Sequence, residues 1–319
     1  MLKKIKTLCF ISFQYIIPQH GLSRLIGKLA SSENIFLKNC LINLAIKKFK
    51  IDLSESLISN PKEFKTFNQF FTRKLKPGAR NFPNRNINLE NNLNIPEKII
   101  SPADGSISQI GKIQAGRIFQ AKKHFFNLEE LLGELPLAFV SPLVGETDLK
   151  ATPKVREGAL DLDLNQFNQG NFCTIYLSPR DYHRVHMPLS GKLLAYRHIP
   201  GDLFSVNNTT ADNIPNLFAR NERVCFFFED LNQKPFIVIM VGALLVASIG
   251  TSFTGIINPR KSKKIFTKKL DQPLFFNQGD ELGFFQFGST AIILFPEDIK
   301  FSHQNNLNPG SKILCGMEI

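Results

Sequence analysis

Short apolar runs separated by turn residues fill the chain beyond residue 100, and this pattern limits the possible folds more than any other feature of the sequence. Each run holds four to six residues, which suits a buried strand and is too short for a buried helix. The clearest runs are Phe172 to Leu177, Cys225 to Phe228, Phe236 to Met240, Leu244 to Ile249 and Ala291 to Phe295. Long helical patterns do not alternate with them, so the sequence predicts an α+β fold whose main domain is largely antiparallel β-sheet.

The first 50 residues carry most of the excess positive charge. They contain nine Lys and Arg and one acid, Glu33, so +8 of the formal net charge of +12 lies there. Within them, Leu22 to Ala30 and Ile35 to Phe49 place apolar residues at near-helical spacing, which is typical of amphipathic helices in a membrane interface. Packing on the protein's own core would give the same period, but the charge excess favours an anionic membrane surface. We predict a membrane-associating helical segment over residues 1–60 and a catalytic domain over 61–319.

A basic and then an apolar stretch opens the chain. Lys3, Lys4 and Lys6 precede the run Leu8 to Ile17, an order that is also found in secretory signals. No small-residue cleavage site follows, because Pro18 comes next. The run of about ten residues is half of the roughly 20 needed to span a bilayer. These features favour a stretch that lies on a membrane rather than one that crosses it.

The spacing of cysteine and histidine argues against disulfides and metal sites. The five cysteines are odd in number and far apart, without a CxxC pair, which indicates free thiols in a reducing compartment. His183 and His186 are three positions apart, but no further His, Cys or Glu completes a zinc-ligand pattern. We therefore expect no metal. The two common types of glycine-rich phosphate loop are also missing from the sequence.

Three polar segments contain the candidate chemistry. Asp104 lies in Ser101 to Gly105, two histidines lie in Ser178 to Pro188, and Gly288-Ser289-Thr290 precedes a strand-like run. Each segment alone is ordinary turn chemistry. An Asp, a His and a Ser on separate loops can nevertheless assemble a relay that orients, deprotonates and attacks. A serine hydrolase of the α/β type would place its nucleophile in G-x-S-x-G, a pattern that Ser289 does not fit.

Six segments together resemble the bacterial phosphatidylserine decarboxylase family, in the same order and with similar spacing. They are Phe67 to Pro77, Pro102 to Gly105, Tyr176 to Pro188, Pro200 to Asn207, Phe218 to Arg223 and Gly288 to Thr290. The Tyr-His-Arg-Val-His-Met-Pro string and the Gly-Ser-Thr site are highly specific together, and the match covers nearly the whole chain. The chain departs from the family at Phe287, where Leu is usual, and around Lys123, Phe126 and Asn127.

The resemblance implies a self-cleaving enzyme that carries a pyruvoyl group. Ser289 would attack the carbonyl of Gly288, with His186 as the base and Asp104 orienting the imidazole. Elimination and hydrolysis would then turn the serine into the pyruvoyl cofactor. Cleavage leaves a small fragment of 31 residues that begins with the cofactor. His183 is the candidate acid that protonates the carbanion left by the loss of carbon dioxide.

The resemblance also implies a substrate, partners and a location. Members of the family convert phosphatidylserine to phosphatidylethanolamine, so we expect a peripheral enzyme on the cytoplasmic face of a bacterial cell membrane. Its partners would be phosphatidylserine and the anionic lipid surface, with no nucleic acid. The two fragments would form a heterodimer, and the family suggests a homodimer of these. Gly201 to Asn207 and nearby arginines are candidate head-group contacts, and Arg260 to Lys269 is a second basic run that suits a solvated loop or a lipid-facing patch equally.

Three other interpretations remain open from the sequence. A pyruvoyl enzyme for a soluble amino acid would share the serine chemistry but has little need for basic amphipathic helices. A membrane-bound serine hydrolase would keep Ser289 as a hydroxyl and the chain in one piece. A non-catalytic membrane-binding protein would explain the N-terminal segment but not the grouping of Asp104, His186 and Ser289.

Overall fold

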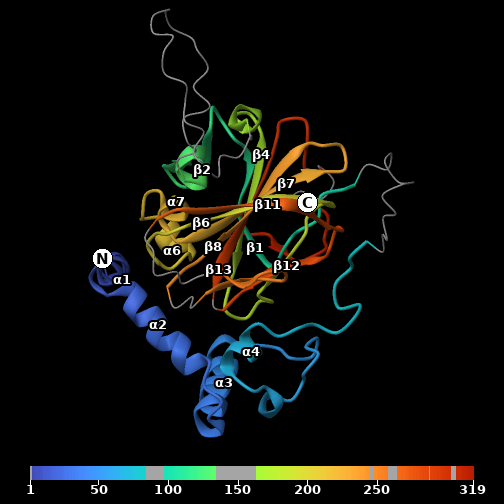
Figure 1. Ribbon diagram of the computed structural model, residues 1–319. Helices are drawn as coiled ribbons and strands as arrows, with labels where there is room; N and C mark the ends of the chain where they lie inside the picture. The colour runs from blue at the N-terminus through green and yellow to red at the C-terminus, as the bar shows by residue number, and fades with distance from the viewer. Residues whose placement is uncertain are drawn as a thin grey trace, which may run out of the picture.

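The computed structural model describes residues 2–83, 97–133, 163–244, 248–257, 264–286, 288–302 and 307–319. Within these ranges, three helices open the chain and shorter helices are scattered through the rest (Figure 1). The helices are α1 (Leu2–Ile16), α2 (Gln19–Ala30), α3 (Ile35–Phe49), α4 (Phe67–Phe71), α5 (Leu128–Leu132), α6 (Asn208–Ala211) and α7 (Leu217–Arg220), with 3-10 turns η1 (Pro61–Glu63) and η2 (Leu164–Phe167).

Nearly half of the described chain beyond residue 100 lies in antiparallel strands. The strands are β1 (Gly105–Lys112), β2 (Arg117–Ala121), β3 (His124–Asn127), β4 (Asn171–Leu177), β5 (Arg184–His186), β6 (Gly191–Ile199), β7 (Arg223–Asp230), β8 (Pro235–Val241), β9 (Ile249–Thr251), β10 (Gly255–Ile256), β11 (Phe266–Phe276), β12 (Glu281–Phe285), β13 (Ser289–Phe295) and β14 (Lys312–Ile313). The largest sheet has the order β11-β6-β7-β8-β13-β4-β1-β14, the second β10-β9-β12-β5, and the third is the hairpin β2-β3. The predicted α+β fold with a mainly antiparallel β domain is confirmed.

Both faces of the eight-stranded sheet are buried at its central strands. On one face, Ile292 and Leu294 of β13 join a cluster that includes α5, α6, α7 and the hairpin. On the other face, Ala291 and Ile293 join a cluster that includes β5, β9 and β12. Because side chains alternate along a strand, a strand covered on both sides is apolar throughout, and every residue of β13 is buried. The strand that begins with Ser289 therefore runs through the middle of the molecule.

The N-terminal region has a small core of its own. Ala30 at the end of α2 and Ile42 and Ala45 of α3 pack with phenylalanines in and around α4. Both α3 and α4 begin at capping residues, because Asn34 accepts from the N–H of Leu37, and Thr66 does the same for Gln69. Figure 1 shows these helices along one side of the β domain, with α3 and α4 at the bottom of the view.

The junction between α1 and α2 is docked on the loop that follows β6. The side chain of Gln14 accepts a hydrogen bond from the main-chain N–H of Ser205 at 2.7 Å. The side chain of Gln19 does the same for Leu203 at 2.6 Å. The candidate head-group segment, Gly201 to Asn207, is therefore held by the N-terminal helices.

The predicted strands are confirmed at four of the five apolar runs, which correspond to β4, β7, β8 and β13. The fifth, Leu244 to Ile249, is wrong in its described part. Leu244 lies in a turn, Ser248 is irregular, and only Ile249 belongs to a strand, while residues 245–247 lie outside the described ranges. The reason is topological, since β8 belongs to the large sheet and β9 to the small one, so the chain has to cross between them here.

The described end of the second basic run lies on an edge strand. Lys268 and Lys269 are exposed residues of β11, whereas residues 260–263 lie outside the described ranges. Exposed lysines are a common protection of a sheet edge against pairing with another chain. This part of the run is therefore a strand rather than the solvated loop considered from the sequence. None of the described helices is both long enough and apolar enough to cross a membrane.

Candidate active site

Ser289 is the first residue of β13 and follows the bend at Gly288. Across the ladder it faces Leu177, the last residue of β4. Its side chain is fully buried, and its Oγ has no hydrogen-bond partner in the part of the chain that the structure describes. A buried hydroxyl left without a partner costs about 1–3 kcal/mol, and such groups in native folds call for an explanation. The unpaired hydroxyl marks this residue as a candidate for chemistry.

Asp104 lies at the same end of the sheet, immediately before β1. Only β4 separates β1 from β13, and strands lie ~4.8 Å apart, so the ends of the two strands are close. The glycine after Asp104 permits this arrangement, because a Cβ at Gly105 would lie 2.3 Å from the carbonyl oxygen of Tyr176 in β4. Strand packing therefore requires glycine at position 105.

The carboxylate of Asp104 is buried, and both of its oxygens accept hydrogen bonds. Arg80 donates from Nε to Oδ1 at 2.8 Å and from Nη2 to Oδ2. The main-chain N–H of Cys315 donates to Oδ1 at 2.9 Å. The same guanidinium also pairs with Glu55 at 2.9 Å. A bidentate pair of this kind is strong and fixes the carboxylate in place.

His186 is the last residue of β5, beside the segment that carries Asp104. Its main-chain N–H donates to the carbonyl of Pro102 at 2.8 Å. Its Nδ1 lies 2.7 Å from the carbonyl oxygen of Gly279, and its Nε2 lies 3.0 Å from the hydroxyl of Tyr182. Because a carbonyl can only accept, Nδ1 carries the proton and Nε2 presents its lone pair. This is the tautomer that a general base at Nε2 needs.

Burial and charge act in opposite directions on this imidazole. Burial lowers the pKa of His186, whereas the Gly279 carbonyl and the charges of Glu281 and Asp104 raise it. Asp104 is thus close enough to stabilise a protonated His186 by its charge, although the two side chains make no hydrogen bond. The neutral form predominates at pH 7, so the ring can take up a proton there.

His183 lies in the loop before β5 and is fully buried. Neither of its ring nitrogens has a hydrogen-bond partner within the described ranges, and its ring packs edge-on against Phe71, with the ring centroids 4.2 Å apart. Its carbonyl accepts from the N–H of Phe285 at 2.9 Å, which places it beside the strand that leads to Gly288. Burial and the charge of Arg73 hold the pKa of His183 well below its ordinary value. This imidazole is therefore neutral and unusually free of polar contacts.

The expected segments come together, but their hydrogen bonds differ from the expected relay. In the described part of the chain, Asp104 does not bond to His186, and the orienting partner of that ring is the carbonyl of Gly279. Arg80 and Gly279 were missed from the sequence. Arg80 is 24 positions before Asp104, and a contact over this distance in the chain follows from no local sequence pattern. Tyr182 was within the specific string, but its hydroxyl had no assigned role.

The thiols and possible metal ligands add no further chemistry. Over the described ranges, no three His, Cys, Asp or Glu side chains come together in a way that could hold a metal ion. Burial raises the pKa of the Cys225 thiol to about 11, and burial together with the nearby Asp104 raises that of Cys315. Both thiols therefore stay protonated and unreactive at neutral pH.

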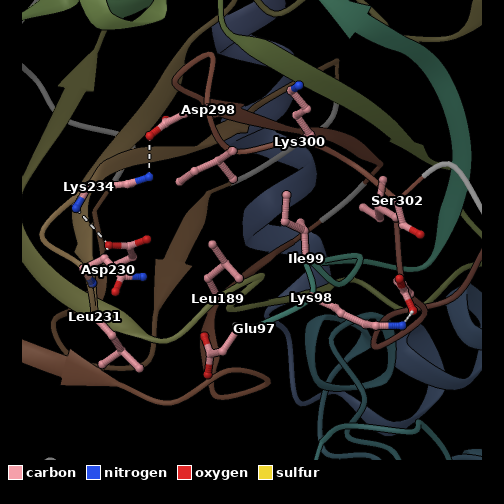
Figure 2. Close-up of a pocket in the computed structure, with 14 residues that line it drawn as sticks. Glu97, Lys98, Ile99, Leu189, Asp230, Leu231, Lys234, Asp298, Lys300 and Ser302 are labelled. Carbon is pink, nitrogen blue, oxygen red and sulfur yellow. Dashed lines mark hydrogen bonds and ion pairs between the residues drawn. The ribbon is translucent and has the colours of Figure 1, made fainter. Parts of the chain in front are cut away.

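A cavity of about 390 Å³ lies elsewhere (Figure 2). Lys234 and Asp298, which form an ion pair in Figure 2, lie on its wall. Asp298 follows the end of β13, whereas Ser289 begins that strand, and a strand of this length spans roughly 20 Å. A second cavity, beside Lys112 and Asn171, is also at this far end. Neither cavity is lined by Asp104, His183, His186 or Ser289, the four candidate residues that form the Ser289 cluster.

Comparison with known proteins identifies the family. The family model described as Phosphatidylserine decarboxylase matches residues 67–319, and a second model described as PSD matches residues 9–50. The chain belongs to the phosphatidylserine decarboxylase family. Curated relatives of this family carry the name phosphatidylserine decarboxylase proenzyme. One from Alcanivorax borkumensis is 46% identical over 95% of this chain and 92% of the relative. One from Pseudomonas putida F1 is 42% identical over 99% and 98%, and one from Acinetobacter baumannii AYE is 43% identical over 98% and 96%.

The bounds of the two family matches correspond to boundaries between structural elements. The phosphatidylserine decarboxylase match begins at Phe67, the first residue of α4, and runs to the end of the chain, while the second match covers most of α1, α2 and α3. Of the departures noted in the sequence, Phe126 is a buried core residue of β3 and Lys123 lies in the hairpin turn. Phe287 lies outside the described residues. The hairpin packs on the face of the sheet opposite Ser289, so these departures lie away from the candidate site.

Proposed function

We propose that the chain decarboxylates phosphatidylserine to phosphatidylethanolamine, using a pyruvoyl group made from Ser289 by self-cleavage after Gly288. Family membership supports the decarboxylation, and the word proenzyme in the names of the relatives supports processing. The observation that carries the proposal is the buried, unpartnered hydroxyl of Ser289 at the end of a central strand, beside the Asp104 and His186 segments.

In the proposed maturation, His186 removes the proton of Ser289, whose Oγ attacks the carbonyl carbon of Gly288. The C–N bond of the peptide breaks and an ester forms, so the serine nitrogen becomes a free amine. Removal of the Cα proton expels the Gly288 carboxylate and leaves dehydroalanine, which tautomerises and is hydrolysed with loss of ammonia. The lone pair on Nε2 suits His186 to the first step, and the charge of Asp104 stabilises the imidazolium.

In the uncleaved chain, the hydroxyl of Tyr182 lies 3.0 Å from Nε2 of His186 and donates a hydrogen bond to its lone pair. For Nε2 to take the proton of Ser289, this hydroxyl has to move away or relay the proton from the serine to the imidazole. Burial raises the pKa of this phenol strongly, so it stays protonated and acts as a donor. The orientation of the ring does not depend on this contact, because the Gly279 carbonyl holds Nδ1.

A pyruvoyl group at position 289 would supply a carbonyl for the substrate amine and a sink for the electrons released with carbon dioxide. His183 is the proposed acid for the carbanion, and because its ring is neutral in the uncleaved chain, it has to take up a proton in the cleaved enzyme before it can donate one. Its position supports this role, since the loop that carries it is hydrogen-bonded to β12, which leads directly to the cleavage site. Its burial excludes water from the proton transfer.

The small fragment stays in the fold after cleavage. Its first strand, β13, pairs with β8 on one side and β4 on the other, and β14 pairs with β1. Every residue of β13 is buried, so dissociation would expose the centre of the sheet. This supports a heterodimer of the two fragments.

We further propose that residues 1–60 attach the enzyme peripherally to the cytoplasmic face of the cell membrane, with 61–319 as the catalytic domain. Several large apolar side chains of the first three helices are exposed to solvent. They are Ile5, Leu8, Phe10, Phe13, Tyr15, Ile16, Leu25, Leu29, Ile35, Phe36 and Leu44. Together with the net charge of +8 on residues 1–50, they suit an anionic lipid interface.

Replacing Leu8, Phe13 and Ile16 with serine should release much of the protein from vesicles that contain anionic lipid. These side chains are 65%, 58% and 81% exposed, so the change removes apolar surface without disturbing the core. Each buried side chain contributes about 1.5–3 kcal/mol to transfer from water, so sedimentation with vesicles should fall at least tenfold. The matched control replaces Ile256, Ile265 and Leu274, which are exposed elsewhere, and should bind normally. Equal release of both variants would contradict a membrane role for α1.

The direct test of the function uses the purified full-length protein. Incubation with vesicles of phosphatidylserine should release carbon dioxide and form phosphatidylethanolamine, whereas free serine should be a poor substrate. A preference for free serine would instead indicate a pyruvoyl enzyme for a soluble amino acid. The absence of both reactions in fully cleaved protein would contradict the proposed function.

A further inference from the structure

Arg73 is a buried cation that uses only part of its hydrogen-bonding capacity. The residue is 5% exposed. Its Nη2 donates to the carbonyl oxygens of Arg180 at 2.9 Å and Asp181 at 3.4 Å. Its Nε and Nη1 are buried and have no hydrogen-bond partner among the described residues. Arg223, a comparably buried residue, donates from all three nitrogens to main-chain carbonyls, so the vacancy on Arg73 is not a general property of buried arginines in this fold.

Within the described ranges, the charge of Arg73 is also not matched by an ion pair. Asp104 and Asp181 are near enough to affect its pKa, which burial lowers. However, Asp104 is bound by Arg80, and Oδ2 of Asp181 accepts from the N–H and hydroxyl of Ser178 at 2.7 Å each. Keeping a guanidinium in a buried place without its own counter-ion costs several kcal/mol. A bound anion would offset that cost.

Arg73 lies against the Ser289 cluster. It closely follows α4, whose Phe71 packs on His183 at 4.2 Å, and its charge lowers the pKa of that imidazole. Its Nη2 holds the loop between β4 and β5. The same loop borders the cleavage site, because a Cβ at Gly288 would lie 4.0 Å from Cγ of Pro179. The free donors of Arg73 are thus next to the residues proposed to react.

We infer that Nε and Nη1 of Arg73 bind the phosphodiester of the lipid head group in the mature enzyme, an inference that rests on the proposed function. A phosphodiester keeps its negative charge at every pH of interest and has two unesterified oxygens that accept charge-assisted hydrogen bonds. The substrate carboxylate is the less suitable partner. During decarboxylation the negative charge moves from the carboxylate to the rest of the substrate as neutral carbon dioxide forms. An ion pair with the carboxylate would therefore stabilise the ground state more than the transition state and slow the reaction.

Cleavage is expected to open this site. In the uncleaved chain, Ser289 and both free nitrogens of Arg73 are closed to solvent. Breaking the peptide bond after Gly288 frees the new chain end beside the loop that Arg73 holds. Phosphodiester binding should therefore belong to the cleaved enzyme and be absent from an uncleaved variant.

The test compares Arg73→Gln and Arg73→Lys with the wild type, using a short-chain, water-soluble phosphatidylserine. Both variants should mature into two fragments. Because a hydrogen bond to a charged group contributes about 1.5–3 kcal/mol, the KM of Arg73→Gln should rise roughly 10- to 100-fold, with a smaller rise for Arg73→Lys. Glycerophosphoethanolamine, which has the phosphodiester and the amine but no carboxylate, should inhibit the wild type and lose its effect on Arg73→Gln. The control is Arg197→Gln, because Arg197 is equally buried and donates to Thr267, Leu132 and Gly133. It should lower thermal stability without raising KM.

Three results would overturn the inference. The first is an unchanged KM in Arg73→Gln. The second is undiminished inhibition of that variant by glycerophosphoethanolamine. The third is a failure of both Arg73 variants to fold or to cleave, which would assign the residue to structure or maturation. A failure of the proposed function itself is distinguishable, because the wild-type protein would then show no turnover of the short-chain lipid.

Discussion

Replacing Ser289 with alanine is expected to leave a single full-length chain of 36.1 kDa that releases no carbon dioxide from phosphatidylserine. The side chain of Ser289 supplies both the nucleophile for cleavage and the atoms of the pyruvoyl group, so one substitution removes both. The variant should fold at least as well as the wild-type precursor, because it deletes a buried hydroxyl whose lack of a partner costs about 1–3 kcal/mol. Its melting temperature should not fall.

Thr290 provides the matched control for this experiment. It is the next residue of β13, and its hydroxyl is likewise buried without a partner. Because side chains alternate along a strand, it points to the opposite face of the sheet, away from the His183 and His186 segments. Thr290→Val keeps the shape of the side chain and should still yield two fragments. Normal fragments from Ser289→Ala, or none from Thr290→Val, would contradict the assignment of the nucleophile.

Replacing His186 with glutamine is expected to trap the uncut chain, whereas replacing His183 with glutamine should permit cleavage and abolish most turnover. His186 presents a lone pair at Nε2 and is the proposed base for maturation. His183 has no polar partner and is the proposed acid in decarboxylation. Loss of a positioned acid or base slows a reaction by about 10²- to 10⁴-fold. Fragment yield on a denaturing gel and carbon dioxide release from cleaved protein measure the two effects separately.

The two histidine variants can also give the reverse result. If His183→Gln stays uncut while His186→Gln matures, the two roles are exchanged. If both mature and turn over normally, neither histidine participates. Comparable melting temperatures of the two variants are needed for the comparison, since both rings are buried.

Asp104→Asn should also accumulate uncut chain, because the amide has no charge to stabilise protonated His186. The substitution also leaves Arg80 with a weakened partner, and breaking a buried ion pair can cost about 3–5 kcal/mol. Glu55→Gln is the control, because it removes the other and more exposed partner of Arg80 and should cleave normally. Cleavage of Asp104→Asn at the wild-type rate would restrict Asp104 to holding Arg80 in place.

The sequence predicted the strands and the meeting of the three polar segments, since strand runs and turn residues are local signals. Its motifs named Asp104, His186 and Ser289 as candidates, but not the contacts between their side chains. The ion pair of Arg80 with Asp104 joins positions that are far apart in the chain, and the Gly279 carbonyl that orients His186 is a main-chain atom. The sequence of residue types does not reveal a main-chain acceptor, so the family resemblance and the chain order Asp, His, Ser gave the orienting role to Asp104.

The strand predicted at Leu244 to Ile249 failed for a related reason. Its apolar residues suit a buried strand, and the sequence contains no sign that the chain changes sheets between β8 and β9. Amphipathic periodicity was more informative at the N-terminus, where α2 and α3 begin close to the predicted positions. There the helical spacing of apolar residues predicted the helices. It could not predict that their apolar side chains are exposed, because the same spacing would result from packing on the protein's own core.

The central claim is that Ser289 becomes a pyruvoyl group, and the intact mass of the small fragment tests it most directly. Purified wild-type protein, denatured and separated, should yield residues 289–319 as a fragment lighter by one ammonia than the same peptide with an N-terminal serine. The fragment should also react with a carbonyl reagent and resist N-terminal sequencing. A fragment of that length with an unmodified serine amine, or an intact chain in a preparation that decarboxylates phosphatidylserine, would contradict the account.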